Sequence, residues 1–76
     1  MGTIWRYYCP FRPPGLGAVP RFAVVMRFYE DRVPVAAIGG RKCWGHVDYA
    51  AELSQQDVYG YELIPDPGNP VYRDYD

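Results

Sequence analysis

Residues 21–30 read RFAVVMRFYE, and this stretch shows the clearest strand pattern in the chain. Successive side chains of a β-strand point to opposite faces of the sheet, so apolar residues at alternate positions predict a strand with one buried face. The apolar alternation begins and ends on an aromatic residue. We therefore expect one face of this strand to form the hydrophobic core, through Phe22, Val24, Met26 and Phe28.

Similar patterns on either side of this stretch predict four further strands. β-Branched and aromatic residues favour the pleated surface of a sheet. Gly45 falls inside one of these strands and indicates either a bulge or an aromatic ring packed against its backbone. The predicted strands span Thr3–Cys9, Val33–Ile38, Arg41–Tyr49 and Tyr61–Ile64.

Glycine and proline separate these strands from one another. Pro10–Pro20 contains four prolines and two glycines, which predicts an extended loop. Glu30–Arg32 is polar and predicts a turn, while Gly39 and Gly40 between two apolar runs predict a hairpin. Pro34 has no N–H group, so the strand that contains it is expected at a sheet edge.

One short helix is predicted near the C-terminal end of the chain. Ser54 can cap the first N–H groups, and Asp57 completes a pattern that is similar to a capping box. Gly60 is a typical end for a helix. Leu53 and Val58 are then expected to hold the helix against the sheet.

These elements predict an α+β, mostly-β fold. We expect a curled antiparallel sheet of four or five short strands, with one short helix before the last strand. The pattern fits an open sheet and a partly open barrel equally well. A chain of 76 residues has room for one domain. We expect residues 1–65 to form a single small globular domain and residues 66–76 to form a polar, flexible C-terminal tail.

Composition narrows the class of protein. Apolar residues make up 49% of the chain and include eight tyrosines, which argues against intrinsic disorder. The longest uncharged apolar run, Phe22–Met26, is far too short to span a membrane. Residues 1–8 lack the apolar run of a signal peptide. We therefore expect a cytoplasmic protein without a membrane contact, with Cys9 and Cys43 as reduced thiols.

The net charge of −1 hides an uneven distribution. Residues 1–29 contain four arginines and no acidic residue, whereas residues 43–76 contain seven acidic residues against Arg73 alone. The two halves either pair within one fold or present a basic and an acidic face to partners. The overall balance is not that of a strong nucleic-acid binder, because phosphate neutralisation requires an excess of basic residues.

Cys43-Trp44-Gly45-His46 is the one motif with residues suited to site chemistry. A structural zinc ion takes four ligands, and Cys9 is the only further cysteine. A Cys–His dyad needs both side chains on one side of the strand. Cys43 and His46 point to opposite faces unless Gly45 forms a bulge. The sequence therefore predicts no enzyme, no catalytic residue, no metal and no cofactor.

Arginine and aromatic residues alternate with the predicted core positions and suggest a binding face. Tyr, Trp and Arg are enriched at protein–protein hot spots, so we expect a protein-binding module whose partner is another protein or a second copy of the chain. The alternative is a single-stranded nucleic acid that stacks on the aromatic rings. A third interpretation is cross-strand packing without a site. The predicted binding residues are Arg6, Tyr8, Arg12, Arg21, Arg27, Tyr29, Trp44 and His46.

Two stretches of the chain also support a resemblance. The first is YYCPFRPP at residues 7–14, followed by GAVPR at residues 17–21; the second is WGHVDY at residues 44–49, followed by Leu53 and by YEL at residues 61–63. Both resemble small uncharacterised proteins of gut Firmicutes and their mobile elements, and the second recurs in larger proteins of conjugative elements. The resemblance implies an accessory protein of a bacterium, plasmid or phage, and it implies no activity.

Overall fold

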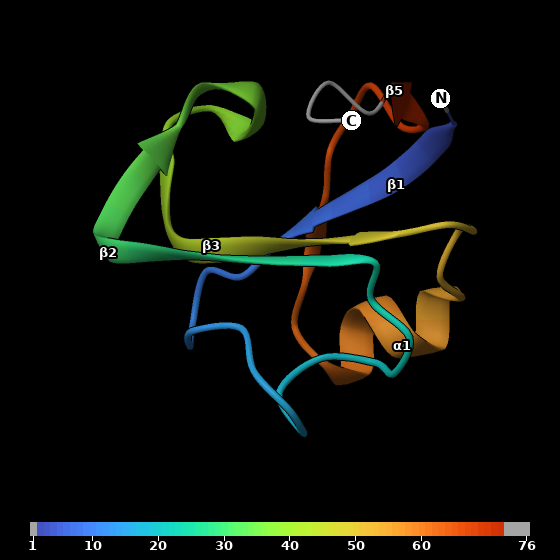
Figure 1. The fold of residues 1–76 in the computed structure, drawn as a ribbon. Helices are drawn as coiled ribbons and strands as arrows, with labels where there is room; N and C mark the ends of the chain where they lie inside the picture. The colour runs from blue at the N-terminus through green and yellow to red at the C-terminus, as the bar shows by residue number, and fades with distance from the viewer. Residues whose placement is uncertain (1, 73–76) are drawn as a thin grey trace.

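The computed structural model describes residues 2–72, which form a mostly-β fold (Figure 1). The antiparallel sheet has the strand order β2-β3-β1-β4, and β5 pairs with β1 as well. An open sheet with one short α-helix before the C-terminal strands confirms the predicted fold class. None of the described helices is long and apolar enough to cross a membrane. The elements are β1 (Thr3–Tyr8), β2 (Val25–Val35), the 3-10 helix η1 (Ala36–Ile38), β3 (Arg41–Tyr49), α1 (Gln55–Gly60), β4 (Ile64–Pro65) and β5 (Val71–Tyr72).

The centre of the sheet is the antiparallel pair of β1 and β3, which confirms both predicted strands. Trp5 lies opposite Tyr49 and Tyr8 lies opposite His46. One face of this pair carries the hydrophobic core, and Figure 1 shows α1 and the loop before β2 on the same side of the sheet. The buried core residues are Tyr7, Cys9, Val19, Val47, Tyr49 and Leu63.

The middle of the chain corrects one prediction. The predicted turn at Glu30–Arg32 does not reverse the chain, because Val33 still pairs with β3, opposite Cys43. β2 is therefore one strand with a register shift between Phe28 and Val33, and it bends sharply there (Figure 1). The separate strand predicted over Val33–Ile38 is wrong, since Ala36–Ile38 forms η1 instead.

The ends of β2 confirm two other predictions. Gly39 and Gly40 make the hairpin to β3, and both have positive φ angles, 76° and 79°, which glycine adopts at no steric cost. β2 is an outer strand of the sheet, so Pro34 lies at an edge as expected.

The main error of burial concerns the predicted core row, which lies on and just before β2. Phe22 is 88% exposed, and the other three residues of the row are 42–58% exposed. The side of the sheet was predicted correctly, because Met26 lies opposite the buried Val47 and paired residues share a face. The row is exposed because β2 is the outermost strand, while the core lies over β1 and β3.

Gly45 allows a close approach of a backbone carbonyl and a proline ring, in place of the aromatic ring that was predicted there. A Cβ atom at this position would lie 2.2 Å from the Arg27 carbonyl oxygen and 2.8 Å from the Pro14 ring. The backbone of β2 and the loop that contains Pro14 therefore both occupy the space where a side chain would be. This contact fixes the loop on the core face of β3.

The short helix forms as predicted. The Ser54 hydroxyl accepts a hydrogen bond of 3.1 Å from the Asp57 N–H group, which caps the first turn. Leu53 and Val58 pack against the core. The strand predicted over Tyr61–Ile64 begins three residues later, because residues 61–62 form a turn before β4.

Residues 66–72, which were predicted to belong to the polar tail, run beside β1. The Asp66 N–H group donates to the Arg6 carbonyl oxygen at 2.9 Å. The Asn69 side chain accepts from the Arg6 N–H group at 2.8 Å and donates to the Arg6 carbonyl at 2.9 Å. Val71 pairs with Ile4. Residues 73–76 of the predicted tail lie outside the described residues, and its flexibility stays a prediction.

Candidate functional site

The predicted binding residues do not form one exposed face. Arg6, Tyr8, Tyr29 and His46 belong to a hydrogen-bonded group on the sheet face opposite the core, which we call the polar network. A fifth residue, Asp48, joins them and was not among the predicted binding residues. Of the other four predicted residues, Arg27 lies opposite His46 on β2 and Trp44 lies on β3, whereas Arg12 and Arg21 lie in the loop before β2.

The ion pair between Arg6 and Asp48 is the centre of the polar network. The two residues lie directly opposite each other on β1 and β3, and the guanidinium meets the carboxylate with hydrogen bonds of 2.9 and 3.1 Å. Asp48 has no exposed surface. A buried carboxylate is tolerated when a fixed cation satisfies it. The pairing of the two predicted strands was the sequence signal that could have revealed Asp48.

His46 connects the ion pair to the aromatic residues. Its Nδ1 atom lies 2.8 Å from the Tyr29 hydroxyl, and its Nε2 atom lies 3.9 Å from the Asp48 carboxylate. The rings of Tyr8 and Tyr29 contact it edge-on, with centroids 6.2 and 5.8 Å away. The imidazole is thus buried and held from several sides.

Tyr8 is also fixed within the fold. Its hydroxyl donates to the Asp66 carboxylate at 2.6 Å. Burial raises the pKa of Tyr8, and the hydrogen bond to Asp66 raises it further, since both favour the neutral phenol. The arrangement of Tyr8 therefore resembles structural packing more than an open stacking surface.

The remaining predicted residues are more accessible. Arg12 binds the Glu62 carboxylate at the surface. The Trp44 ring is half-buried, and the Arg32 guanidinium lies 6.0 Å from its centroid. Arg21 and Arg27 are exposed, and neither side chain makes a hydrogen bond or an ion pair within residues 2–72.

Both cysteines are buried and free. Burial raises the pKa of Cys9 to about 11, and burial also raises the pKa of Cys43, so both thiols are protonated at neutral pH. The described part of the chain contains no group of three or more His, Cys, Asp or Glu residues that could hold a metal ion. The predicted lack of catalysis and of a cofactor stays a prediction.

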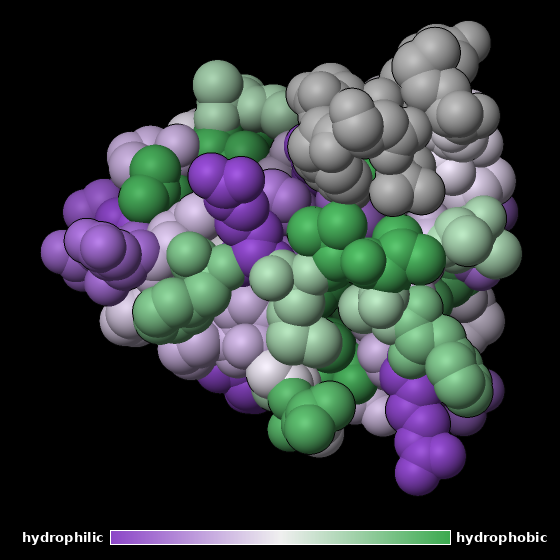
Figure 2. All heavy atoms as spheres, viewed as in Figure 1, coloured by the Kyte–Doolittle hydropathy of each residue, from purple (hydrophilic) through white to green (hydrophobic). Residues whose placement is uncertain are grey.

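A second surface is formed by the exposed residues on and before β2, which we call the apolar row: Phe22, Val24, Met26 and Phe28. A hollow of about 440 Å³ adjoins this row and is lined in part by Leu16 and Tyr61. Figure 2 shows apolar surface over β2 and down to the tip of the preceding loop, interrupted by polar atoms. This surface was not predicted as a site, because the same alternation of apolar residues predicts a core.

Residues 2–68 match a family model described as Defence against restriction A C-terminal. The matched range runs from the start of β1 past β4, so it contains both the polar network and the apolar row. No curated protein and no solved structure matches the chain significantly. The family match supports the coarser part of the resemblance, an accessory domain of bacteria or their mobile elements, and does not address gut Firmicutes.

Proposed function

We propose that this chain, which belongs to the Defence against restriction A C-terminal family, is a non-enzymatic accessory domain that binds another protein through its apolar row. The family's description refers to defence against restriction and to a C-terminal region. A region of that kind works beside further parts of a larger protein or assembly. We place the protein in the cytoplasm of a gut Firmicute and its gene in that bacterium or on one of its mobile elements. Both stay predictions.

The exposure of the apolar row carries the proposal. Four large apolar side chains in a row of seven residues, Phe22–Phe28, are 42–88% exposed. Large apolar side chains that gather on an exposed surface mark sites of protein–protein contact. β2 is also an outer strand, and such strands bind partners by adding a strand to the sheet. The geometry therefore suits a partner that covers the row and extends the core.

Charge narrows the chemistry of this partner. Two of the four arginines in the basic half are neutralised within the fold, Arg6 by Asp48 and Arg12 by Glu62. Of the other two, Arg21 lines the hollow beside the apolar row with Phe22 and Met26, whereas Arg27 is exposed on the opposite face of β2, where it pairs with His46. A partner with apolar anchors and neighbouring carboxylates would satisfy both features. Such a partner is more acidic at its contact surface than this chain.

Affinity capture from a lysate of a bacterium that carries the gene tests the proposal. The wild type is compared with a Met26→Ser/Phe28→Ser variant whose fold is confirmed by its amide NMR spectrum. A captured protein is then purified and its affinity is measured directly. We expect the double variant to bind at least about tenfold more weakly, because it removes anchor residues from the interface.

Tyr59→Ser provides the matched control, because Tyr59 is 76% exposed on α1 and lies outside the row. It should leave the affinity unchanged. A partner that binds both variants equally well would contradict the proposal. Loss of capture on nuclease treatment, with a steep salt dependence, would instead support single-stranded nucleic-acid binding. Sedimentation of the wild type shows whether the partner is a second copy of the chain.

A further inference from the structure

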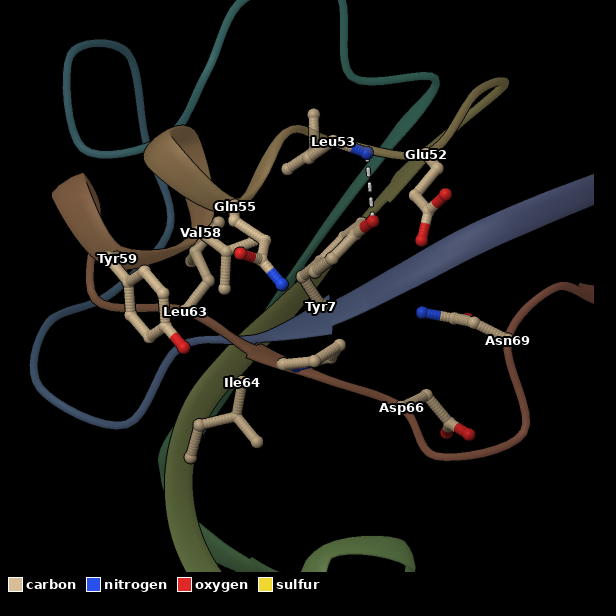
Figure 3. Close-up of a pocket in the computed structure, with 11 residues that line it drawn as sticks. Tyr7, Glu52, Leu53, Gln55, Val58, Tyr59, Leu63, Ile64, Asp66 and Asn69 are labelled. Carbon is tan, nitrogen blue, oxygen red and sulfur yellow. Dashed lines mark hydrogen bonds between the residues drawn. The ribbon is translucent and has the colours of Figure 1, made fainter.

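A second hollow lies between α1, β1 and β4, and the proposed function makes no use of it (Figure 3). Its volume of about 450 Å³ falls in the range of sites for small molecules and side chains. The segment Glu52–Leu53 forms its upper wall, and Asp66 and Asn69 lie at the lower right in the view. The hollow therefore has its own set of residues, separate from the apolar row.

Apolar side chains form the inner wall of this hollow. Leu63 is buried, and Leu53 and Val58 pack against the same core cluster. Because these residues belong to the core of the fold, the wall is held in shape without a ligand. An unbranched aliphatic chain could lie along it and exclude water from it.

The polar groups of the hollow are acidic or neutral. Its lining includes Glu52 and Asp66 and no basic residue. The Asp66 carboxylate is taken up by hydrogen bonds from the Tyr8 hydroxyl at 2.6 Å and the Gly68 N–H group at 2.8 Å, on the side of β1 away from Tyr7, so Glu52 supplies the charge for a ligand. Glu52 is exposed, and its carboxylate makes no hydrogen bond or ion pair within residues 2–72. A cation is therefore the charged group that this hollow favours.

The Tyr7 hydroxyl adds a neutral polar atom on the side of the hollow where Glu52 lies. It accepts a hydrogen bond of 2.9 Å from the Leu53 N–H group. Figure 3 shows the Glu52 carboxylate and this hydroxyl on the same side of the hollow, away from Tyr59. Burial raises the pKa of Tyr7, and the nearby Glu52 charge raises it further. Tyr7 therefore stays neutral beside the carboxylate.

We propose that this hollow binds a primary ammonium group on an unbranched aliphatic chain, the chemistry shared by a lysine side chain and a simple alkylamine. The chain lies against Leu53, Val58 and Leu63. The ammonium group, which has three N–H donors, binds the Glu52 carboxylate. This site is independent of the apolar row, so either proposal can fail without the other.

A titration with n-pentylamine at pH 7, followed by methyl NMR of the full chain, tests the site. We expect saturable shifts of the methyl signals of Leu53, Val58 and Leu63. 1-Pentanol has the same chain without the charge and should bind about fivefold more weakly, the effect of one solvent-accessible ion pair. Pentanoate should give no saturable shift, because its carboxylate is repelled.

Glu52→Gln keeps the shape of the side chain and should weaken pentylamine binding about fivefold. Glu62→Gln makes the same change of net charge outside the hollow and should have no effect. Equal binding of pentanol and pentylamine, or equal effects of the two variants, would overturn the proposal. A short peptide that contains one lysine and has blocked termini is titrated in the same way. If the peptide binds more tightly than pentylamine, the ligand is a lysine side chain of a protein. The proposal fails if neither probe binds.

Discussion

The polar network and the apolar row are a pair of regions with reversed burial. Asp48 and His46 carry charge or polarity and are 0% and 8% exposed, whereas Phe22 and Phe28 are 88% and 58% exposed. Hydrophobicity alone would assign the opposite order. The difference shows that a side chain is buried by the elements that cover it, and that the position of its strand in the sheet decides which elements these are.

The reversal also separates structural from functional residues. Within the polar network, the groups find partners inside the fold, as in the Arg6–Asp48 fork and the Tyr29–His46 hydrogen bond. The side chains of the apolar row face water, which costs free energy unless another surface covers them. We therefore attribute the arginine–aromatic pattern mainly to folding and propose the apolar row as the binding surface.

Asp48→Ala should have the largest effect on stability. It leaves the partly buried Arg6 guanidinium without its carboxylate, and removal of one partner of a buried ion pair costs about 3–5 kcal/mol. The measurement is the free energy of unfolding from urea denaturation. The reference is Arg12→Ala, because the Arg12–Glu62 pair has 47% exposed side chains and should contribute less than about 1 kcal/mol. Equal losses for the two variants would contradict a structural role for the network.

Gly45→Ala should have the second-largest effect on stability. It tests the close packing around Gly45, which joins the two regions. The added Cβ atom would meet the Arg27 carbonyl and the Pro14 ring, so β2 or the loop must move. Overpacking of this kind costs about 1–3 kcal/mol. Gly60→Ala is the matched control, since no atom lies within 4 Å of its added Cβ. Urea denaturation of both variants measures the difference, and a neutral Gly45→Ala would show that the loop does not pack on β3.

High pH should lower the free energy of unfolding through Cys9, which lies in the covered part of the core. The thiol keeps its proton in the fold up to a pKa of about 11, while the unfolded thiol loses it near 9.0. The unfolded state then binds fewer protons, so the stability is full below pH 9 and falls as the pH rises, by up to about 1.4 kcal/mol per pH unit. Denaturation at pH 8, 9 and 10 measures the slope. Cys9→Ala should reduce it, and an unchanged slope would exclude this thiol as the cause.

Strand periodicity predicted a large part of the fold. β1 and β3 lie where the alternation of Thr3–Cys9 and Arg41–Tyr49 places them, because pairing and alternation are local properties of the backbone. The turn predicted at Glu30–Arg32 failed for a non-local reason. Polar residues are compatible with a turn and with a bend in an outer strand, and only the pairing of Val33 with Cys43 decides between them.

The candidate sites were less accessible to sequence reasoning. The pattern of arginine and aromatic residues is the same whether they face water or one another, and Asp48 changes the interpretation only once it lies opposite Arg6. The apolar row shows the converse problem. Its face was predicted correctly from Met26 and its neighbours, but the order of the strands, which leaves β2 uncovered, is not a local property.

Phe28→Ser should have the smallest effect and tests the comparison most directly. Phe28 is 58% exposed, so the loss of stability should stay below about 1 kcal/mol, as for most surface substitutions. Val47→Ala removes a smaller apolar group from the same face of the sheet, but Val47 is fully buried, and the loss there should be about 2 kcal/mol. Urea denaturation of both variants gives the order. If Phe28→Ser costs more than Val47→Ala, the row is part of the core in solution, and the protein-binding surface must lie elsewhere.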